Sequence, residues 1–577
     1  MRDAPNPLRG PTSRPFLRRA LGRAALLLPF ISGTAGCDYE EASEPIGVSV
    51  TALSGSSCGD PDSPTPGGNP FTEAPSVKVA VRAYDDVSKQ METLATASSR
   101  IAQGKALEVP RIPEGVGREV VLFAQTSAGQ GWYGRDTGIT ILRNQDNAAG
   151  MLLTRFGGFS CAPTPNGIQT TVFPAAVAVG DGRILVTGGF TEVAADGGKR
   201  LTGASSQAFF FDPRTGAIEI LPNLGVNQGR AGHAAVYLES IDKVVIIGGM
   251  TELGLDETRP FPYVFDPARG RDDYLLFDVK TKTFSEGVDR MVARRGFPRV
   301  LELADGTVLI TGGGAWPFDP TGTAQIEVDI FDPEDNDRQG GLLDIPPMRS
   351  FFWRAGHSLT FLDITEEGLS TALIWGGTTL DRSLGNPAEV FRQSGRQREG
   401  VNGTFSQVTL LSETGENPPF LYFHETTRLS GNRFLVTGGS RHASNLLQVP
   451  EADESWLLTY ADIGGAPTIS VRRVRGLGAG RVFHSALSDD LARVSVLGGL
   501  GPLEAVANPV MTFDLGSLTW RAEDAAAGQT TGRGAHAALL TPAGSHLLIG
   551  GESSLRSSFG APRMALEVYT PSTLPLP

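Results

Sequence analysis

The chain has 577 residues, of which 50 are Lys or Arg and 63 are Asp or Glu, and its formal net charge is −13. Because an acidic surface repels polyanions, this balance excludes nucleic acid as a partner and direct docking on anionic lipid headgroups. The length calls for more than one domain. Outside the N-terminus no apolar run is long enough to span a membrane, and 72 glycines agree with an all-β body.

Residues 1–36 have the layout of a bacterial secretion signal. Arginines precede the apolar stretch 24–31, and small residues then lead to Cys37. The TAGC sequence at 34–37 resembles a lipobox, which implies that Cys37 carries lipid in the mature protein. Without residues 1–36, which hold six arginines and one aspartate, 44 basic and 62 acidic residues remain, a net charge of −18. We therefore expect export and lipid anchoring to the bacterial cell envelope, with the choice of membrane open.

A separate region lies between Cys37 and the repeats. Residues 37–75 are rich in Glu, Ser, Pro and Gly, which predicts a flexible tether that contains a first strand at 46–53. Residues 76–160 alternate in the way that strands do, which predicts a small immunoglobulin-like β-sandwich. The other strand-like runs are 77–85, 106–112, 119–127, 137–142 and 151–156.

Three cysteines are present, and lipidation of Cys37 would leave Cys58 and Cys161 as a pair. In an oxidising envelope compartment such a pair is expected to form a disulfide, whereas two unrelated thiols are the alternative.

Residues 165–577 form a seven-fold repeat, in which a short apolar run ends in Gly-Gly. The first glycines follow one another at intervals of 52 to 64 residues, which is typical of a propeller or a solenoid. The seven runs are ILVTGG (184–189), VVIIGG (244–249), VLITGG (308–313), ALIWGG (372–377), FLVTGG (434–439), VSVLGG (494–499) and HLLIGG (546–551).

Each repeat has the same internal order. It starts at an anchor residue, continues into two apolar stretches joined by a tight turn such as Asp181-Gly182, and ends in an aromatic run. The Asp-Gly pair favours a mirror-image hairpin turn. Four antiparallel strands per repeat are predicted, and the last repeat must borrow its fourth strand from 151–156 or 167–172, because its own end is rich in proline. The anchors are Pro174, His233, Pro298, His357, His424, His484 and His536.

This pattern resembles the kelch repeat, and the resemblance covers about seventy per cent of the chain. It implies a seven-bladed β-propeller, although Pro174 and Pro298 depart from the usual histidine. Galactose oxidase shares this architecture, with a propeller and a β-sandwich. Its cofactor needs a propeller cysteine that is cross-linked to tyrosine, and this chain has no cysteine after Cys161. We therefore expect no copper chemistry, no other cofactor and no metal.

Arginine stands three residues before the anchor in five repeats, and two interpretations of these arginines remain open. A residue that recurs with the repeat usually serves the repeat, so the guanidinium groups are interpreted first as ties to backbone carbonyls. Alternatively, a ring of positive charge binds an acidic peptide or glycan by bidentate contacts. The candidate ligand-binding residues are Arg230, Arg295, Arg354, Arg481 and Arg533 together with Trp316, Arg382, Arg441 and His442 from the adjoining loops.

Two function classes follow. The first is a monomeric, non-enzymatic kelch protein that binds a protein or polysaccharide at one propeller face. If the arginines bind the ligand, this partner is acidic. The second is a hydrolase or lyase that acts on envelope carbohydrate at the channel mouth. The sequence identifies no catalytic residue, which favours the first class, whereas a cluster of carboxylates with perturbed pKa values in the channel would favour the second.

Overall fold

The computed structural model describes residues 47–54, 70–162 and 167–577, apart from gaps of which the longest are 314–326, 378–387, 395–402, 448–453, 524–531 and 557–565. The chain is all-β, as predicted. It divides into two compact units. The described residues of the first unit lie within 47–53, 70–151 and 575–577, and those of the second unit are Ser54 and residues within 152–574.

The first unit is built on one seven-stranded sheet with the order β3-β2-β5-β6-β7-β1-β4. Its two edge strands, β3 and β4, contact each other, so the sheet curls back on itself instead of forming two separate hydrogen-bonded layers. The elements are β1 (Val48–Ser54), α1 (Pro70–Glu73), β2 (Val77–Asp85), β3 (Gln90–Ser99), β4 (Ala106–Val109), β5 (Gly115–Gln125), β6 (Gly131–Ile141) and β7 (Ala148–Arg155).

Six of these strands coincide with the strand-like runs of the sequence, and β3 was not predicted. Most β3 residues are exposed or half-buried, so its sequence lacks the apolar alternation that marks a half-buried strand. The unit also contains residues 575–577, and the backbone carbonyl of Leu576 accepts a hydrogen bond from Arg82 Nη2 on β2.

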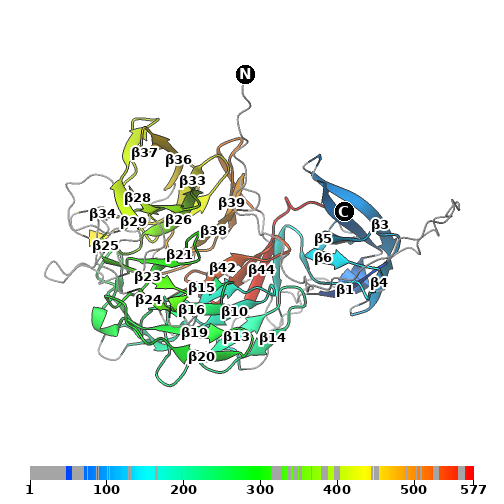
Figure 1. Ribbon diagram of the computed structural model, residues 1–577, viewed down its shortest axis with the longest axis horizontal. Coiled ribbons are helices and arrows are strands. Elements are labelled where there is room, and N and C mark those ends of the chain that lie inside the picture. The colour runs from blue at the N-terminus through cyan, green and yellow to red at the C-terminus, as the bar shows by residue number, and fades with distance from the viewer. Residues whose placement is uncertain are drawn as a thin grey trace, which may run out of the picture. The chain divides into compact units, whose positions relative to one another are not determined.

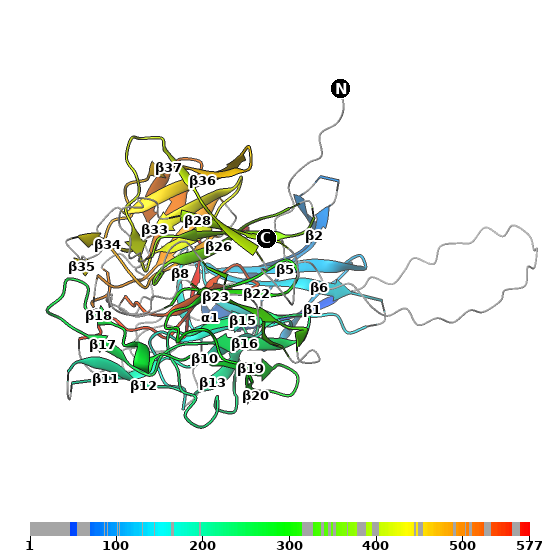
Figure 2. The same cartoon turned by 60° about the vertical axis from the view of Figure 1, so that its left-hand side comes forward.

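The described residues of the second unit contain nine sheets. Seven of them correspond one to each Gly-Gly run, and they can be followed from cyan to red in Figures 1 and 2. In every repeat the first strand begins directly after the anchor and the second strand ends at the glycines. In the order of the repeats, the first two strands are β9 (Ala175–Ala178) and β10 (Ile184–Thr187), β15 (Ala234–Leu238) and β16 (Lys243–Ile247), β21 (Arg299–Glu302) and β22 (Val308–Thr311), β26 (Ser358–Ile364) and β27 (Ser370–Trp375), β32 (Glu425–Arg428) and β33 (Arg433–Thr437), β38 (Ser485–Ser488) and β39 (Arg493–Leu497), and β42 (Ala537–Leu540) and β43 (His546–Ile549).

The outer strands come from the aromatic runs and the segments that follow them. They are β13 (Ala208–Phe211) and β14 (Ile218–Ile220), β19 (Tyr274–Asp278) and β20 (Thr283–Glu286), β23 (Glu327–Asp332) with β24 (Gly341–Leu342) and β25 (Met348–Arg349), β28 (Ala388–Gln393) and β29 (Gly403–Gln407), β36 (Ser455–Ile463) and β37 (Ala466–Arg473) with β30 (Thr409–Ser412), β40 (Val510–Asp514) and β41 (Thr519–Ala522), and β44 (Leu566–Thr570) with β8 (Gly158–Cys161).

Two smaller sheets are built from loops after the Gly-Gly pairs and from residues 421–422, which lie just before the anchor His424. One has the order β11-β12-β17-β18 and joins the loops of repeats one and two, and the other has the order β31-β34-β35. The elements are β11 (Phe190–Ala194), β12 (Arg200–Ala204), β17 (Leu253–Leu255), β18 (Tyr263–Val264), η1 (Pro267–Arg269), β31 (Leu421–Tyr422), β34 (Ser440–Ala443) and β35 (Leu446–Leu447).

The first strands of neighbouring sheets contact one another in sequence order. β9 contacts β15, the contacts continue through β21, β26, β32 and β38 to β42, and β42 contacts β9. The circle of contacts therefore includes all seven repeats.

The fourth strand of the last sheet does come from before the first repeat, as predicted, but from another segment. β8 pairs antiparallel with β44, with Tyr569 opposite Phe159. Residues 151–156 were a wrong choice because most of them belong to β7, and residues 167–172 contain no strand. Gly157, with a φ of 69°, provides the turn between β7 and β8.

The hairpin turns at Asp-Gly differ from the predicted type. A mirror-image turn of type I′ needs positive φ at both central residues, but at Asp181-Gly182 the glycine alone has it, with a φ of 86°. Val179 N donates to Arg183 O at 2.9 Å, so the turn has an extra residue. Asp305-Gly306 behaves in the same way. Within the described part of the chain, no helix is long and apolar enough to cross a membrane.

Candidate functional site

The five arginines proposed as ligands are buried inside the second unit. Their relative exposure is between 0% and 3%. Each Nη1 donates to the carbonyl of the first glycine of its own repeat: the acceptors are Gly248 for Arg230 (3.1 Å), Gly312 for Arg295 (2.7 Å), Gly376 for Arg354, Gly498 for Arg481 (2.9 Å) and Gly550 for Arg533 (2.7 Å). These contacts agree with the first interpretation, in which the guanidinium groups are ties to backbone carbonyls.

Buried carboxylates from the third strand region complete four of these sites. The closest nitrogen–oxygen distances are 3.3 Å for Arg230–Asp273, 2.7 Å for Arg295–Asp329, 2.8 Å for Arg354–Glu389 and 2.8 Å for Arg533–Glu567. Each of these four guanidinium groups therefore ties the start of a sheet to its own Gly-Gly pair and to its third strand. This geometry favours a structural role for the arginines over ligand binding.

Burial dominates the electrostatics of Arg230 and Arg481. It lowers the pKa of Arg230 to about 10, against the opposing charge of Asp273, and it lowers the pKa of Arg481 to about 10. Burial also acts to raise the pKa of Asp273, but the hydrogen bond from Arg271 and the charges of Arg230 and Arg271 outweigh it, so this pKa is lowered. The arginine sites are charged pairs enclosed in protein, where removing one partner is costly.

Backbone contacts between repeats explain the Gly-Gly pairs. Gly189 N donates to Arg230 O of the next repeat at 2.9 Å, and Gly551 N donates to Thr171 O of repeat one at 2.8 Å. A Cβ on Gly188 would lie 2.2 Å from Arg230 O, and one on Gly550 would lie 2.2 Å from Thr171 O. Since both glycines of each pair also have positive φ, no other residue fits at these positions without strain.

The anchor histidines bind hydroxyl groups of the preceding repeat. Their Nε2 atoms lie 2.8 to 3.1 Å from a threonine or serine oxygen. The pairs are His233–Thr187, His357–Thr311, His424–Ser358, His484–Thr437 and His536–Ser485. Burial and then the charge of Arg230 lower the pKa of His233 to about 3, and burial lowers those of His424 and His536 to about 3, so these rings are neutral.

The same contact explains why two anchors are prolines. In three repeats the hydroxyl partner of the next anchor histidine is the threonine that ends the second strand, namely Thr187, Thr311 or Thr437. In two other repeats Trp375 or Leu497 ends the second strand. There the histidine binds the serine that pairs with this residue across the sheet, which is Ser358 or Ser485. The repeats before Pro174 and Pro298 offer neither hydroxyl: Ile549 pairs with Ala537, and Ile247 pairs with Ala234. A histidine would have no partner at these two positions, and proline avoids that cost.

An aromatic cluster fills the centre of the circle of first strands. The residue before each anchor has a left-handed backbone, and four of these residues are Phe173, Phe297, Phe423 and Phe483, with φ between 52° and 57°. The ring centroid of Phe483 lies 4.8 Å from both Phe173 and Phe423. Left-handed non-glycine residues store strain, which the packing of these rings offsets.

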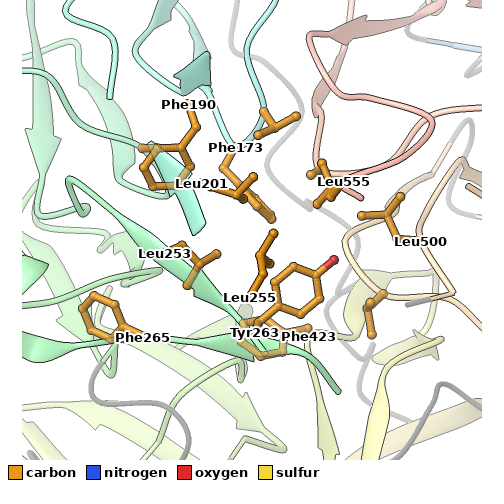
Figure 3. Packing of buried hydrophobic residues seen from close by; sticks show 14 of the residues in the cluster. Phe173, Phe190, Leu201, Leu253, Leu255, Tyr263, Phe265, Phe423, Leu500 and Leu555 are labelled. Atoms are coloured by element: carbon orange, nitrogen blue, oxygen red, sulfur yellow. The ribbon is translucent and has the colours of Figure 1, made fainter. Parts of the chain in front are cut away.

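Loops after the Gly-Gly pairs cover the phenylalanines with further apolar side chains. Phe261 stacks on Phe423 at 5.5 Å, and Tyr263 meets Phe483 edge to face at 4.8 Å. Figure 3 shows side chains from several sheets gathered around one centre. We call this group the central apolar cluster; its buried members are Val172, Phe173, Phe190, Leu201, Ala231, Met250, Leu253, Leu255, Phe261, Tyr263, Phe265, Ala355, Tyr422, Phe423, Val482, Leu500, Leu503, Ala535 and Leu555.

Ion pairs link the loops around this cluster. Arg556 of repeat seven contacts Glu257 of repeat two at 3.3 Å and Glu504 of repeat six at 2.9 Å. Lys199 of repeat one also pairs with Glu257. These side chains are about one quarter to one half exposed, so they form a charged surface that joins four loops. We call this surface the loop face.

The remaining candidates are placed as follows. Arg441 and His442 lie on β34, which pairs with β31 and β35. Trp316 and Arg382 lie outside the described residues, as do Cys37 and Cys58, whereas Cys161 is fully buried on β8. Among the described residues, no group of three His, Cys, Asp or Glu side chains is arranged to hold a metal ion.

Sequence reasoning missed a cavity of about 180 Å³ on the strand side of the phenylalanines. The four phenylalanines line it together with Arg299 and Glu425, which form an ion pair of 3.2 Å. A signal was present: Arg299 and Glu425 directly follow the anchors of repeats three and five, where the other five repeats carry Ala or Ser. Because the other repeats carry a small residue at this position, the charged residues indicate a role that is particular to repeats three and five.

The sequence matches no protein-family model and no curated protein. Among solved structures, one similar chain is a fungal alcohol oxidase of the AA5 family in complex with copper, 14% identical, with a TM-score of 0.47 over 74% of this chain and 79% of that one. Another is YjhT, 10% identical, with a TM-score of 0.36 over 61% of this chain and 94% of that one. Similarities of this size identify no activity.

Proposed function

We propose that the second unit is a closed seven-bladed propeller of the kelch type. Three features support closure: the circle of contacts among first strands, the pairing of β8 with β44, and the hydrogen bond from Gly551 N to Thr171 O. The histidine contacts link neighbouring blades at five of the seven boundaries, as expected of repeats whose stability depends on their neighbours.

We further propose that the protein is a non-enzymatic scaffold whose loop face binds a protein or glycan partner. The observation that carries this proposal is the central apolar cluster. It fills the centre under the loops, where a reaction pocket would otherwise lie, and the ion pairs of Arg556 and Glu257 join the loops around it into one surface. Such a surface suits recognition of a partner by its exposed charged side chains.

The proposal includes a monomer held at the cell envelope by lipid on Cys37, with a disulfide between Cys58 and Cys161. The order of arginines, apolar stretch, small residues and cysteine supports the anchor. The oxidising compartment that export implies supports the disulfide. A mass measurement of the unreduced mature protein tests both: it should show a lipid adduct and two fewer hydrogens than the free thiols.

Photo-crosslinking in the cell envelope tests the binding face. A photoreactive residue replaces Thr258 or Arg556, both exposed in loops of the loop face, and matched controls replace Ser240 or Glu367 in hairpin turns at the other ends of the blades. We expect one defined crosslinked species from the loop positions and none from the controls. Equal crosslinking from both sets would refute loop-face binding.

One observation favours the second class, a carbohydrate-active enzyme. Glu302 ends the first strand of repeat three, and although much of the residue is exposed, burial of its carboxyl and then the charge of Glu239 raise its pKa. A carboxyl with a raised pKa beside another carboxylate is a usual arrangement for a general acid. Hydrolysis of envelope polysaccharide that disappears in Glu302→Gln, and persists in a Glu367→Gln control, would replace the scaffold proposal.

A further inference from the structure

The cavity at Arg299 and Glu425 has the features of a small-ligand site. Its floor is apolar, because the rings of Phe173, Phe297 and Phe423 face it together with Phe483. Its wall is polar at Arg299 and Glu425. The cavity volume of about 180 Å³ is several times the volume of one water molecule, which occupies roughly 30 Å³ in the liquid.

The ion pair in the wall keeps unused hydrogen-bonding capacity. Arg299 Nε donates to His357 O at 3.0 Å, and Arg299 Nη2 donates to Glu425 Oε1 at 3.2 Å. Within the described part of the chain these are the hydrogen bonds that the two side chains make. A guanidinium has five N–H donors and a carboxylate has two acceptor oxygens, so donors on Arg299 and an acceptor on Glu425 remain. The side chains are 36% and 32% exposed, which leaves these atoms reachable.

The ring of first strands does not need this pair for its closure. Ala175, Ala234, Ser358, Ser485 and Ala537 hold the same position in the other repeats, and their strands make the same circle of contacts. Half-exposed ion pairs also contribute little to stability. A structural role alone therefore leaves the two charged residues unexplained.

We propose that the cavity binds an uncharged polyhydroxy ligand, such as a small polyol or the end of a saccharide chain. Because Arg299 and Glu425 neutralise each other, a neutral ligand leaves their charges balanced, whereas a charged ligand adds an unpaired charge. Two neighbouring hydroxyl groups match the wall: one accepts from Arg299 and the other donates to Glu425. The C–H face of such a ligand lies on the phenylalanine floor.

This site lies on the strand side of the phenylalanines, and none of the loop-face residues that pair with Arg556 line it. The inference therefore does not rest on loop-face binding, and each can fail without the other.

Calorimetric titration of the full mature chain with Cys37→Ala tests the proposal. The probes are myo-inositol and methyl glucoside as neutral polyols, gluconate as an anion of similar size, and glycine as a smaller zwitterion that carries both charges. We expect the neutral polyols to bind at least about 10-fold more tightly than the charged probes. Tighter binding of gluconate or glycine, or no saturable binding of either polyol up to about 50 mM, would overturn the proposal.

Two variants locate the binding. Glu425→Ala should weaken polyol binding about 10-fold or more. The matched control is Asp462→Ala, which breaks the partly exposed Arg392–Asp462 pair of 2.7 Å outside the cavity and should leave binding unchanged. If Glu425→Ala does not fold, Glu425→Gln keeps the side-chain volume and one acceptor oxygen, and should still weaken binding measurably. Unchanged affinity in the folded Glu425 variant would refute the site.

A further titration distinguishes the two sources of such a ligand. Cellotriose carries the same hydroxyl chemistry on a longer chain. Binding of cellotriose as tight as that of methyl glucoside identifies the end of a glycan as the ligand, and binding restricted to the small probes identifies a free polyol. Both results support the cavity as the binding site.

Discussion

The pairing of anchor histidines with hydroxyl groups predicts a compensating pair of substitutions. Thr187→Val keeps the side-chain shape and removes the hydroxyl that lies 2.8 Å from His233 Nε2. His233 is 7% exposed and Thr187 is 1% exposed, so either single change leaves a buried polar atom without its partner. We expect Thr187→Val and His233→Pro each to lower the free energy of unfolding by about 1–3 kcal/mol.

The double variant Thr187→Val/His233→Pro should lose less than the two singles combined. It recreates the aliphatic–proline arrangement that the chain itself has at Ile549 with Pro174 and at Ile247 with Pro298. The coupling should recover at least about 1 kcal/mol, measured by urea unfolding of the Cys37→Ala protein.

A control and a refuting result complete this test. Ile549→Val, in a repeat that already has proline at the next anchor, should cost about 0.5–1.5 kcal/mol and show no coupling to His233→Pro. If the double variant loses as much as the sum of the single variants, hydroxyl pairing does not decide between histidine and proline.

Three further predictions concern the buried charges, the neutral histidines and the anchor. Replacing Arg354 with Met should lower the free energy of unfolding by about 3–5 kcal/mol, because Glu389 is 0% exposed and would keep an unpaired charge. The double variant Arg354→Met/Glu389→Met should regain most of this loss in the same urea assay. Acid should destabilise the fold below about pH 6.5. The pKa of His233 is lowered to about 3 in the folded protein, so between these two pH values the unfolded chain binds a proton that the folded chain does not. The free energy of unfolding therefore falls as the pH falls, by roughly 2 kcal/mol per such histidine at pH 5. Thermal unfolding from pH 8 to pH 5 checks this, and a flat profile would contradict the neutral, buried histidines. Cys37→Ala should move the protein from the membrane fraction to the soluble fraction, and a wild-type protein that is already soluble would refute the lipid anchor.

The sequence was sufficient for those parts of the fold that repeat. Seven Gly-Gly runs located seven second strands, and the anchors located seven first strands, because close approach between neighbouring repeats imposes the same residue at the same position each time. β3 was missed since an exposed strand carries no apolar alternation. The choice between residues 151–156 and 167–172 as the borrowed strand failed because pattern alone could not show that β7 uses the first segment.

The site could be predicted less well than the fold. The two interpretations of the arginines could not be separated in sequence, because the carboxylates that enclose them, such as Asp329 and Glu389, lie 34 and 35 residues further along the chain. The pair Arg299 and Glu425 is 126 residues apart and meets only when the repeats close around one centre. Comparison of equivalent positions among repeats would have identified both residues, because charge replaces Ala or Ser there.

Binding and turnover measured on one preparation test the proposed function most directly. The Cys37→Ala protein is incubated with polysaccharide isolated from the envelope of the source cell, retention on the polymer is measured, and the polymer is analysed by mass spectrometry for shortened or unsaturated chains. If the partner is a glycan, the scaffold proposal predicts saturable retention and an unchanged polymer; if it is a protein, it predicts no retention and again an unchanged polymer. Formation of shortened or unsaturated products that is lost in Glu302→Gln would contradict it.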